Sequence, residues 1–96
     1  ENIYPKEIED VIANHPAVME VAVFGIPDEV WGESVCAAVV PKEAHRVTEQ
    51  ELIDFCKERL AGYKVPTHYE FRTELPKTTV GKILRRELVR EHMENL

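Results

Sequence analysis

The segment LPKTTVGKILRREL, residues 75–88, organises the rest of this chain. Pro76 cannot continue a regular element, and Gly81 permits a close approach of the backbone to another group. Apolar residues then recur at helical spacing, which predicts a helix over about residues 82–93. Lys82 stands where an irregular polar loop enters this helix. We therefore expect the chemistry of the protein at Lys82.

A glycine followed by a lysine also occurs in the phosphate-binding P-loop, but this segment does not fit that motif. The P-loop needs a glycine five residues before its Gly-Lys pair, and here that position is Pro76. It also needs Ser or Thr after the lysine to hold magnesium, whereas Ile83 follows Lys82. The P-loop interpretation is therefore rejected.

The size and composition indicate one small globular domain. The chain has 96 residues, of which 44% are hydrophobic and 31% charged, which is ordinary for a globular protein. No apolar run approaches the roughly 20 residues that a transmembrane helix needs. The net charge of −6 argues against a general nucleic-acid binder.

The charge is distributed unevenly along the chain. Residues 1–54 carry three Lys or Arg against twelve Asp or Glu, whereas residues 55–96 carry nine against six. Five basic residues and one acid lie between Lys77 and Arg90. Two interpretations stay open: a solvated helix face, or a local positive field that faces a polyphosphate.

The cysteines and histidines show no metal-ligand spacing. Cys36 and Cys56 lie within apolar patterns, so we expect buried, free thiols in a reducing compartment. The four histidines are scattered along the chain. No metal ligand is predicted.

The first half predicts a helix followed by two strands. The helix is expected over about residues 5–14, with Glu7, Glu9 and Asp10 placed favourably in its N-terminal half. Strands are expected over residues 18–24, ended by Gly25 and Pro27, and over residues 34–40. Because the connection between these strands leaves no room for a helix, we expect an antiparallel pair.

The second half predicts a helix, a strand and the final helix. Thr48 and Glu51 form a capping box, and the helix is expected to reach about Leu60, with Gly62 as its C-terminal cap. Alternating residues around 69–71 predict a third strand. The expected fold class is α+β: a small three-stranded sheet with an antiparallel pair, covered by about three helices.

Three motifs give a family resemblance. Pro76-Lys77-Thr78-x-x-Gly81-Lys82-Ile83-x-Arg85-x-x-Leu88 resembles the last core motif of the adenylate-forming superfamily, which includes acyl- and aryl-CoA synthetases, adenylation domains of peptide synthetases, and luciferases. Glu1-Asn2-Ile3-Tyr4-Pro5 resembles the segment just past that family's interdomain hinge, in the wording of CoA synthetases. Pro27-Asp28-x-x-Trp31-Gly32-Glu33 is also characteristic. Residues 1–96 are thus similar to the small C-terminal lid domain of an acyl-CoA synthetase.

The resemblance implies a two-step reaction. A carboxylic acid attacks the α-phosphate of ATP with the help of Mg²⁺, and CoA then displaces AMP to form a thioester. Lys82 matches the family's adenylation lysine, a compact cation able to bridge carboxylate and phosphate oxygens. The lid then rotates on its hinge, withdrawing this lysine and presenting its opposite face for thioester formation. The large N-terminal domain is the implied partner, so these 96 residues alone are expected to be inactive.

The resemblance also implies residues on the CoA and ATP side: Trp31, Tyr63, Lys64 and Gly81. In the family, the tryptophan packs near the adenine of CoA in some members, and the aromatic-Lys-x-Pro segment lies along the CoA path. The plain alternatives are a partly buried aromatic for Trp31 and a solvent-facing charge for Lys64. Basic residues flank the proline in some aryl-CoA ligases, but Val65 and Thr67 occupy those positions here.

Two other functions compete with an acyl-CoA ligase lid. One is the small domain of an adenylation module that loads a carrier protein. The other is a non-catalytic module that binds a nucleotide or an acidic partner through its basic C-terminal helix, for which Arg85 and Arg86 would matter more than Lys82. The family further implies a cytoplasmic enzyme, with fatty acid metabolism as the expected setting.

Overall fold

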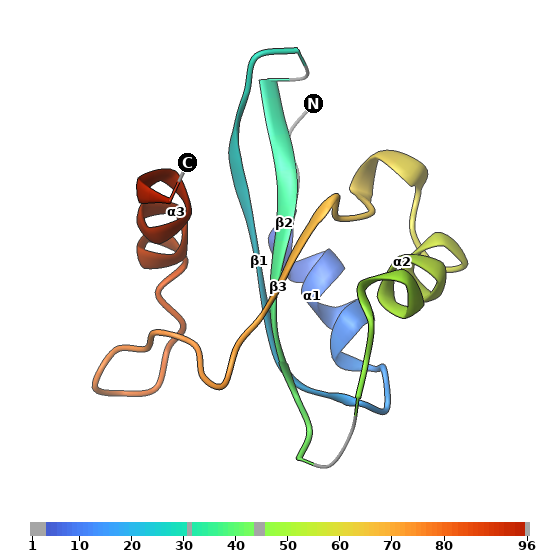
Figure 1. Ribbon diagram of the computed structural model, residues 1–96, viewed down its shortest axis with the longest axis horizontal. Coiled ribbons are helices and arrows are strands. Elements are labelled where there is room, and N and C mark those ends of the chain that lie inside the picture. The colour runs from blue at the N-terminus through green and yellow to red at the C-terminus, as the bar shows by residue number, and fades with distance from the viewer. Residues whose placement is uncertain (1–3, 31, 44–45, 96) are drawn as a thin grey trace.

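The computed structural model describes residues 4–30, 32–43 and 46–95. Within them lie α1 (Pro5–Ala13), β1 (Val18–Asp28), β2 (Gly32–Pro41), α2 (Glu49–Lys57), the 3-10 helix η1 (Gly62–Lys64), β3 (His68–Phe71) and α3 (Arg85–Glu94). The sheet is covered by α1 and α2 on one face and by α3 on the other (Figure 1). The expected α+β class, with a three-stranded sheet and an antiparallel pair, is confirmed.

The sheet has the strand order β1-β2-β3. β1 and β2 are antiparallel, with Val21 opposite Val39, as predicted. β3 runs parallel to β2, with Cys36 opposite His68. A parallel neighbour requires a crossover connection, and α2 lies in that connection. The sequence had predicted β3 without its direction.

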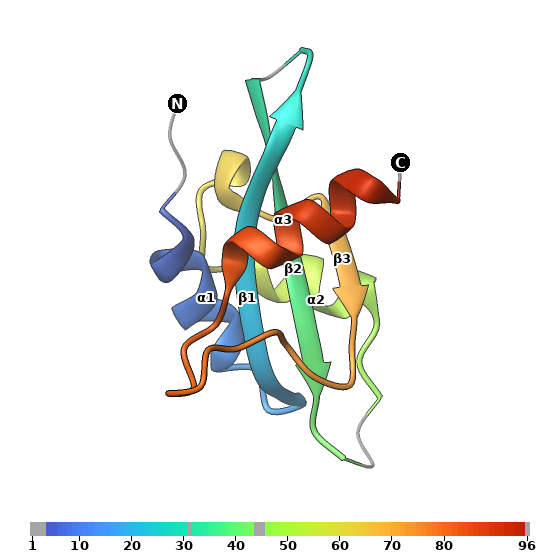
Figure 2. The same cartoon turned by 90° about the vertical axis from the view of Figure 1, so that its left-hand side faces the viewer.

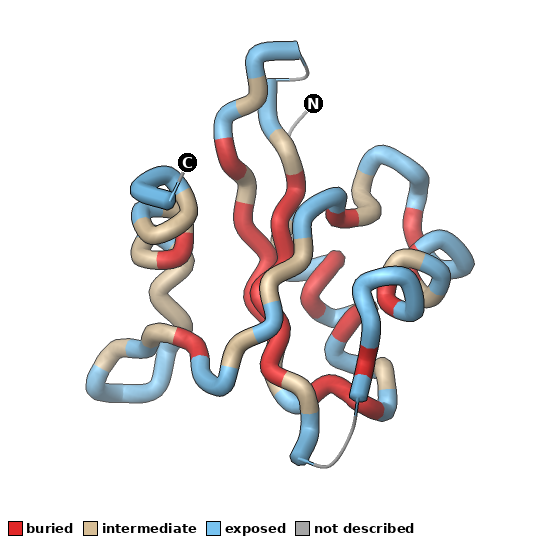
Figure 3. The backbone as a smooth tube through the Cα atoms, viewed as in Figure 1, coloured by how far each residue is buried: buried red, intermediate tan, exposed pale blue. Residues whose placement is uncertain are grey.

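Two apolar cores form because successive strand residues point to opposite faces. Figure 3 shows the buried residues concentrated along β1 and β2, between the helices. One core joins the strands to α1 and α2, through side chains that include Ile8, Ile12, Val23, Val39, Leu52 and Cys56. The other joins them to α3 and the segment before it, through side chains that include Phe24, Cys36, Ala38, Leu75 and Leu88. Burying Leu88 completely contributes about 1.5–3 kcal/mol toward holding α3 on the sheet.

The end of β1 differs from the prediction. Gly25 and Pro27 do not stop the strand, which continues to Asp28, with Pro27 opposite Glu33. β1 is an edge strand, and a proline is tolerated there because it need not donate to a second neighbour. The predicted long connection is therefore mostly strand.

Two helix boundaries also differ. The capping box of Thr48 and Glu51 is confirmed, but α2 ends at Lys57 with Glu58 as its C-cap, and Gly62 opens η1 instead of capping α2. The prediction that the last helix begins at Lys82 was wrong: α3 begins at Arg85. Ile83 was predicted to lie in the helix, yet its backbone forms an isolated bridge with Lys77.

Both cysteines are buried and free, as predicted. Burial raises the pKa of the Cys36 thiol to about 11, with a smaller contribution from the nearby charge of Glu70. The Cys36 thiol is therefore protonated at neutral pH and is a poor nucleophile. In the part of the chain that the structure describes, no helix combines the length and the apolar character that a membrane crossing needs.

Candidate functional site

Lys82 lies in a compact turn, the lysine hairpin (residues 76–84), that crosses the α3 face of the sheet. Figure 2 shows this segment and α3 together over that face. The backbone N–H of Thr78 donates to the Lys82 carbonyl at 2.7 Å, and the N–H of Leu84 donates to the Pro76 carbonyl at 2.9 Å. The loop expected from the sequence is thus a small hairpin with its own hydrogen bonds.

The turn of the hairpin fixes the backbone on both sides of Lys82. The Gly81 N–H donates to the Thr78 carbonyl at 2.9 Å, and the Lys82 N–H donates to the Thr78 hydroxyl at 3.1 Å. Gly81 has φ +88°, a left-handed conformation that a side chain would strain. From the sequence, a glycine at position 81 was explained by close approach of the backbone to another group. The positive φ gives a second, structural reason for glycine at this position.

The Lys82 side chain is exposed and forms no ion pair or side-chain hydrogen bond with any residue in the described ranges. Its ammonium group can therefore contact an external anion without first breaking an internal bond. A compact charge on a flexible stem suits simultaneous contact with a carboxylate and a phosphate oxygen. The exposed Lys82 ammonium can therefore reduce the repulsion between two anionic groups that approach each other.

An ion pair between Arg85 and the buried carboxylate of Glu9 fixes the junction between the lysine hairpin and α3. The Arg85 guanidinium donates to the Glu9 carboxylate of α1 through Nε at 2.9 Å and through a terminal nitrogen at 2.5 Å. The Val23 N–H on the outer edge of β1 donates to the same carboxylate at 2.7 Å. Glu9 is only 7% exposed, and a buried carboxylate without such partners would cost several kcal/mol.

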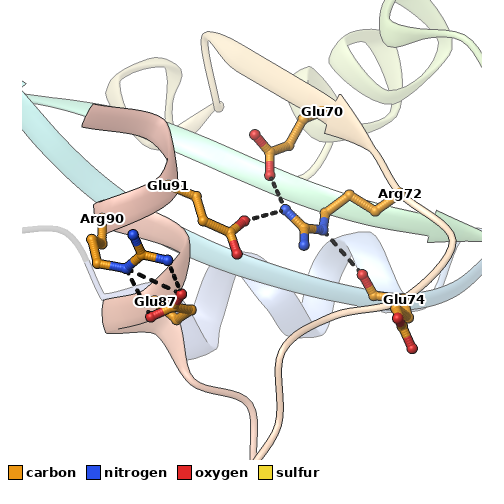
Figure 4. A network of polar contacts seen from close by, with 6 residues as sticks. All are labelled: Glu70, Arg72, Glu74, Glu87, Arg90 and Glu91. Atoms are coloured by element: carbon orange, nitrogen blue, oxygen red, sulfur yellow. Dashed lines mark hydrogen bonds and ion pairs between the residues drawn. The ribbon is translucent and has the colours of Figure 1, made fainter. Parts of the chain in front are cut away.

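Further polar contacts of Lys77 and Arg72 anchor the hairpin and the segment that leads to it. The Lys77 ammonium nitrogen lies 2.5 Å from a carboxylate oxygen of Glu20 on β1. Arg72, just after β3, donates to the Glu70 and Glu91 carboxylates and to the Glu74 carbonyl, thereby linking β3 to α3 (Figure 4). The hydrogen bond to Glu91 is the main cause of the raised Arg72 pKa. The backbone that leads to Lys82 is thus held from both sides.

The basic stretch from Lys77 to Arg90 is not a uniform positive field. Lys77 and Arg85 are paired as described, and Arg90 is paired with Glu87 and Glu94 on its own helix (Figure 4 draws the Glu87 contact). The hydrogen bond from Arg90 lowers the pKa of Glu87. Within the described ranges, only Lys82 and Arg86 of this stretch form no ion pair.

Two of the residues predicted on the CoA and ATP side, Tyr63 and Lys64, lie apart from Lys82. Tyr63 and Lys64 belong to η1, on the α1 and α2 side of the sheet, whereas Gly81 and Lys82 lie on the α3 side (Figure 1). Tyr63 is 57% exposed. Trp31 lies outside the described residues. The structure thus brings Gly81 and Lys82 together on one face, and Tyr63 and Lys64 on the other.

Lys64 differs from the solvent-facing charge considered as one alternative. Its side chain is 18% exposed, and its ammonium donates to Glu7 of α1 at 2.8 Å. This hydrogen bond is the main cause of the raised pKa of Lys64. Its ammonium therefore stays charged at neutral pH, but it is engaged by a carboxylate.

The described residues contain no group of three or more His, Cys, Asp or Glu side chains arranged to hold a metal ion. The donor set thus does not fit a Mg²⁺ site, since Mg²⁺ prefers carboxylate oxygens and water in octahedral geometry.

Glu9 is the residue that sequence reasoning missed. It was grouped with Glu7 and Asp10 as a favourable charge near the N-terminus of α1. The available signal was its position: Glu9 directly follows Ile8 and precedes Ile12 by three residues, which places it beside the apolar stripe of the helix. An acid at such a position needs a partner, and that partner lies 76 residues away.

Comparison with known proteins identifies similar sequences. Residues 7–82 match the AMP-binding enzyme C-terminal domain. The chain is 53% identical over 94 residues to a long-chain-fatty-acid–CoA ligase of Bacillus subtilis, covering 98% of this chain and 17% of that protein. It is 52% identical over 88 residues to a 2-succinylbenzoate–CoA ligase of Bacillus cytotoxicus, covering 92% of this chain and 18% of that protein.

A solved structure shows the same fold. ATP-bound MatB from Rhodopseudomonas palustris superposes with a TM-score of 0.92 at 35% identity, covering 96% of this chain and 18% of that chain. The present chain therefore spans less than a fifth of the proteins that it matches.

Proposed function

The chain belongs to the AMP-binding enzyme C-terminal domain family, and from that premise we propose that it serves as the C-terminal domain of an AMP-forming acyl-CoA ligase. Lys82 supplies the positive charge for adenylation of a carboxylic acid by ATP. The observation that carries the proposal is an exposed lysine that forms no ion pair with any of the residues the structure describes, held in a hydrogen-bonded hairpin.

In the proposed first step, a carboxylate oxygen of the acid attacks the α-phosphorus of ATP and pyrophosphate leaves. The Lys82 ammonium contacts oxygens of both reactants and reduces the repulsion between them. Mg²⁺, when bound, neutralises charge on the leaving pyrophosphate; the groups that hold it are assigned to the large domain. Because the hairpin is preformed, little reorganisation is needed to place the ammonium.

In the proposed second step, the thiol sulfur of CoA attacks the acyl carbonyl carbon of the adenylate, loses its proton, and AMP leaves. The lid rotates between the two steps. This proposal draws support from the separation of the two predicted groups, with Lys82 on the α3 face and Tyr63 and Lys64 on the opposite face (Figure 1). Each face then serves one half-reaction.

The whole enzyme is proposed to act in the cytoplasm, on a carboxylic acid whose pocket belongs to the large N-terminal domain. The relatives named above are ligases of a long-chain fatty acid and of 2-succinylbenzoate at nearly equal identity. The acid is therefore assigned only as a class. CoA is preferred over a carrier protein as the thiol because both relatives are named as CoA ligases.

A non-catalytic module that binds through its basic helix receives less support. That alternative relied on Arg85 and Arg86, and Arg85 is bound to the buried Glu9. Arg90, on the same helix, is paired with Glu87 and Glu94. The last helix therefore offers much less free positive charge than its sequence suggests.

The proposal is tested by Lys82→Ala in the full-length ligase that carries this domain. Adenylation is followed by pyrophosphate exchange, and thioester formation by supplying preformed acyl-adenylate and CoA. We expect adenylation to fall by about 100-fold or more, as when a charge-stabilising group is removed, with thioester formation largely unchanged. Lys57→Ala is the matched control, because Lys57 is an exposed lysine on α2.

Two outcomes contradict the proposal. Unchanged adenylation removes the catalytic assignment of Lys82. Equal losses in both half-reactions assign Lys82 to folding or docking instead.

A further inference from the structure

We propose that Glu9 is a positioning residue for adenylation: through Arg85, it fixes the lysine hairpin against α1 and β1 and so places Lys82. This inference rests on the proposed function of Lys82. It assigns a role in the reaction to the Glu9 carboxylate of α1, which acts through Arg85 and not by contact with a reactant.

The first support is the geometry of the pair. Arg85 is the first residue of α3 and follows Lys82 by three positions. Its two bonds to Glu9, at 2.9 and 2.5 Å, engage both carboxylate oxygens. A two-bond contact between planar groups fixes orientation as well as distance. A shift of Arg85 relative to α1 therefore carries the adjacent end of the hairpin with it.

The second support is burial together with a third donor. Glu9 is 7% exposed, and the Val23 N–H of β1 donates to the same carboxylate at 2.7 Å. α1 and α3 lie on opposite faces of the sheet (Figure 1), so the pair passes around the outer edge of β1. One carboxylate thus joins a helix of each face to the strand between them.

The third support is the contrast with the other ion pairs near the hairpin. Lys77 and Glu20 form a single, partly exposed contact with a flexible lysine, and the Arg90 contacts to Glu87 and Glu94 stay within α3. Exposed pairs of this kind constrain structure weakly. In the Arg85–Glu9 contact only the carboxylate is buried, since the Arg85 side chain is 41% exposed, but this contact engages both oxygens of a buried carboxylate and joins distant segments. These two features make it the contact best suited to set the position of Lys82.

Glu9→Gln in the full-length ligase tests the inference. The amide oxygen of Gln can still accept from the Val23 N–H, while the charge that faces Arg85 is lost. We expect kcat for adenylation to fall about 10-fold, because small misplacements of a catalytic group are costly, with the KM for ATP changed less than about two-fold. Thioester formation from preformed acyl-adenylate should stay within about two-fold of wild type, because Lys82 is not used in that step.

Two further variants complete the design. Arg85→Lys keeps the charge but loses the two-bond contact, so it should also lower adenylation while leaving thioester formation unchanged. If Glu9→Gln does not fold, this variant alone tests the inference. Glu94→Gln makes the same chemical change in an exposed pair of α3 and should leave adenylation unchanged. Circular dichroism and the Tm of each variant establish that it is folded.

Non-additivity separates positioning from a general structural role. If Glu9 acts through Lys82, adding Glu9→Gln to Lys82→Ala lowers adenylation no further than Lys82→Ala alone. A further 10-fold loss in the double variant, or parallel losses in both half-reactions for Glu9→Gln and Arg85→Lys, overturns the inference. If Lys82→Ala abolishes adenylation and folded Glu9→Gln does not change it, only the positioning role is lost. If Lys82→Ala changes nothing, the proposed function fails as well.

Discussion

Two lysine-bearing segments of this small domain present opposite arrangements. In the lysine hairpin, internal hydrogen bonds and neighbouring ion pairs fix the backbone, while the Lys82 ammonium has no partner among the described residues. In η1, the Lys64 ammonium is bound to Glu7 of α1. The comparison teaches that nearby carboxylates decide whether a surface lysine supports the fold or is available to a substrate.

The strongest test of this comparison, beyond the replacement of Lys82 itself, is Gly81→Ala. Gly81 has φ +88°, and forcing alanine into this region costs about 1–2 kcal/mol per residue. The turn must relax, and the neighbouring Lys82 shifts with it. We expect adenylation to fall about 10-fold and thioester formation to change little, as measured by the two half-reaction assays.

Gly62→Ala is the matched control. A Cβ at Gly62 would also meet open space, but Gly62 does not have the positive φ of Gly81. Alanine should therefore be accommodated at Gly62 with little effect on adenylation. Similar losses in both variants would show that Gly81 matters for a reason other than its backbone conformation.

A smaller effect is expected from Lys64→Ala. If Lys64 lies along the CoA path, its removal should raise the KM for CoA by about three- to five-fold, because one partly exposed charge contact with CoA is lost. Adenylation should be unchanged, because Lys64 lies across the sheet from Lys82 (Figure 1). Steady-state kinetics with varied CoA measures the effect, with Lys57→Ala as the control. An unchanged KM would assign Lys64 to the fold alone.

The sequence predicted the fold well where burial is decided by a local pattern. The apolar run from Val35 to Val40 predicted a strand over residues 34–40, and β2 lies there with apolar side chains buried on both of its faces. The errors occurred where tertiary context overrides local preference. Pro27 is accommodated because β1 is an edge strand. Ile83, predicted to lie in the last helix, forms a bridge with Lys77 before the helix begins.

For the candidate site, the sequence could identify individual residues but not their pairing. The motif around Lys82 predicted which lysine to examine, and its exposure is consistent with that choice. The partners of Arg85 and Lys64 lie 76 and 57 residues away along the chain. No local pattern relates residues at such separations, so the sequence left open whether the basic stretch forms a positive field and could not predict the ion pairs that engage Lys77, Arg85 and Arg90.

The smallest effect is predicted for Glu7→Gln, the variant that would make Lys64 resemble Lys82. This change weakens the contact that holds Lys64 and leaves its ammonium freer, as that of Lys82 already is. If Glu7 competes with CoA for Lys64, the KM for CoA should fall, which is opposite in sign to the effect of Lys64→Ala. The expected change is only about two-fold, because partly exposed pairs are weak. The Glu7→Gln, Lys64→Ala double variant should match Lys64→Ala alone, because Glu7 then has no cation to hold. A KM for CoA that rises in Glu7→Gln would instead mean that the Glu7–Lys64 pair holds Lys64 in the position that CoA requires. Lys64 and Lys82 would then both be available to a substrate and would differ only in how they are positioned.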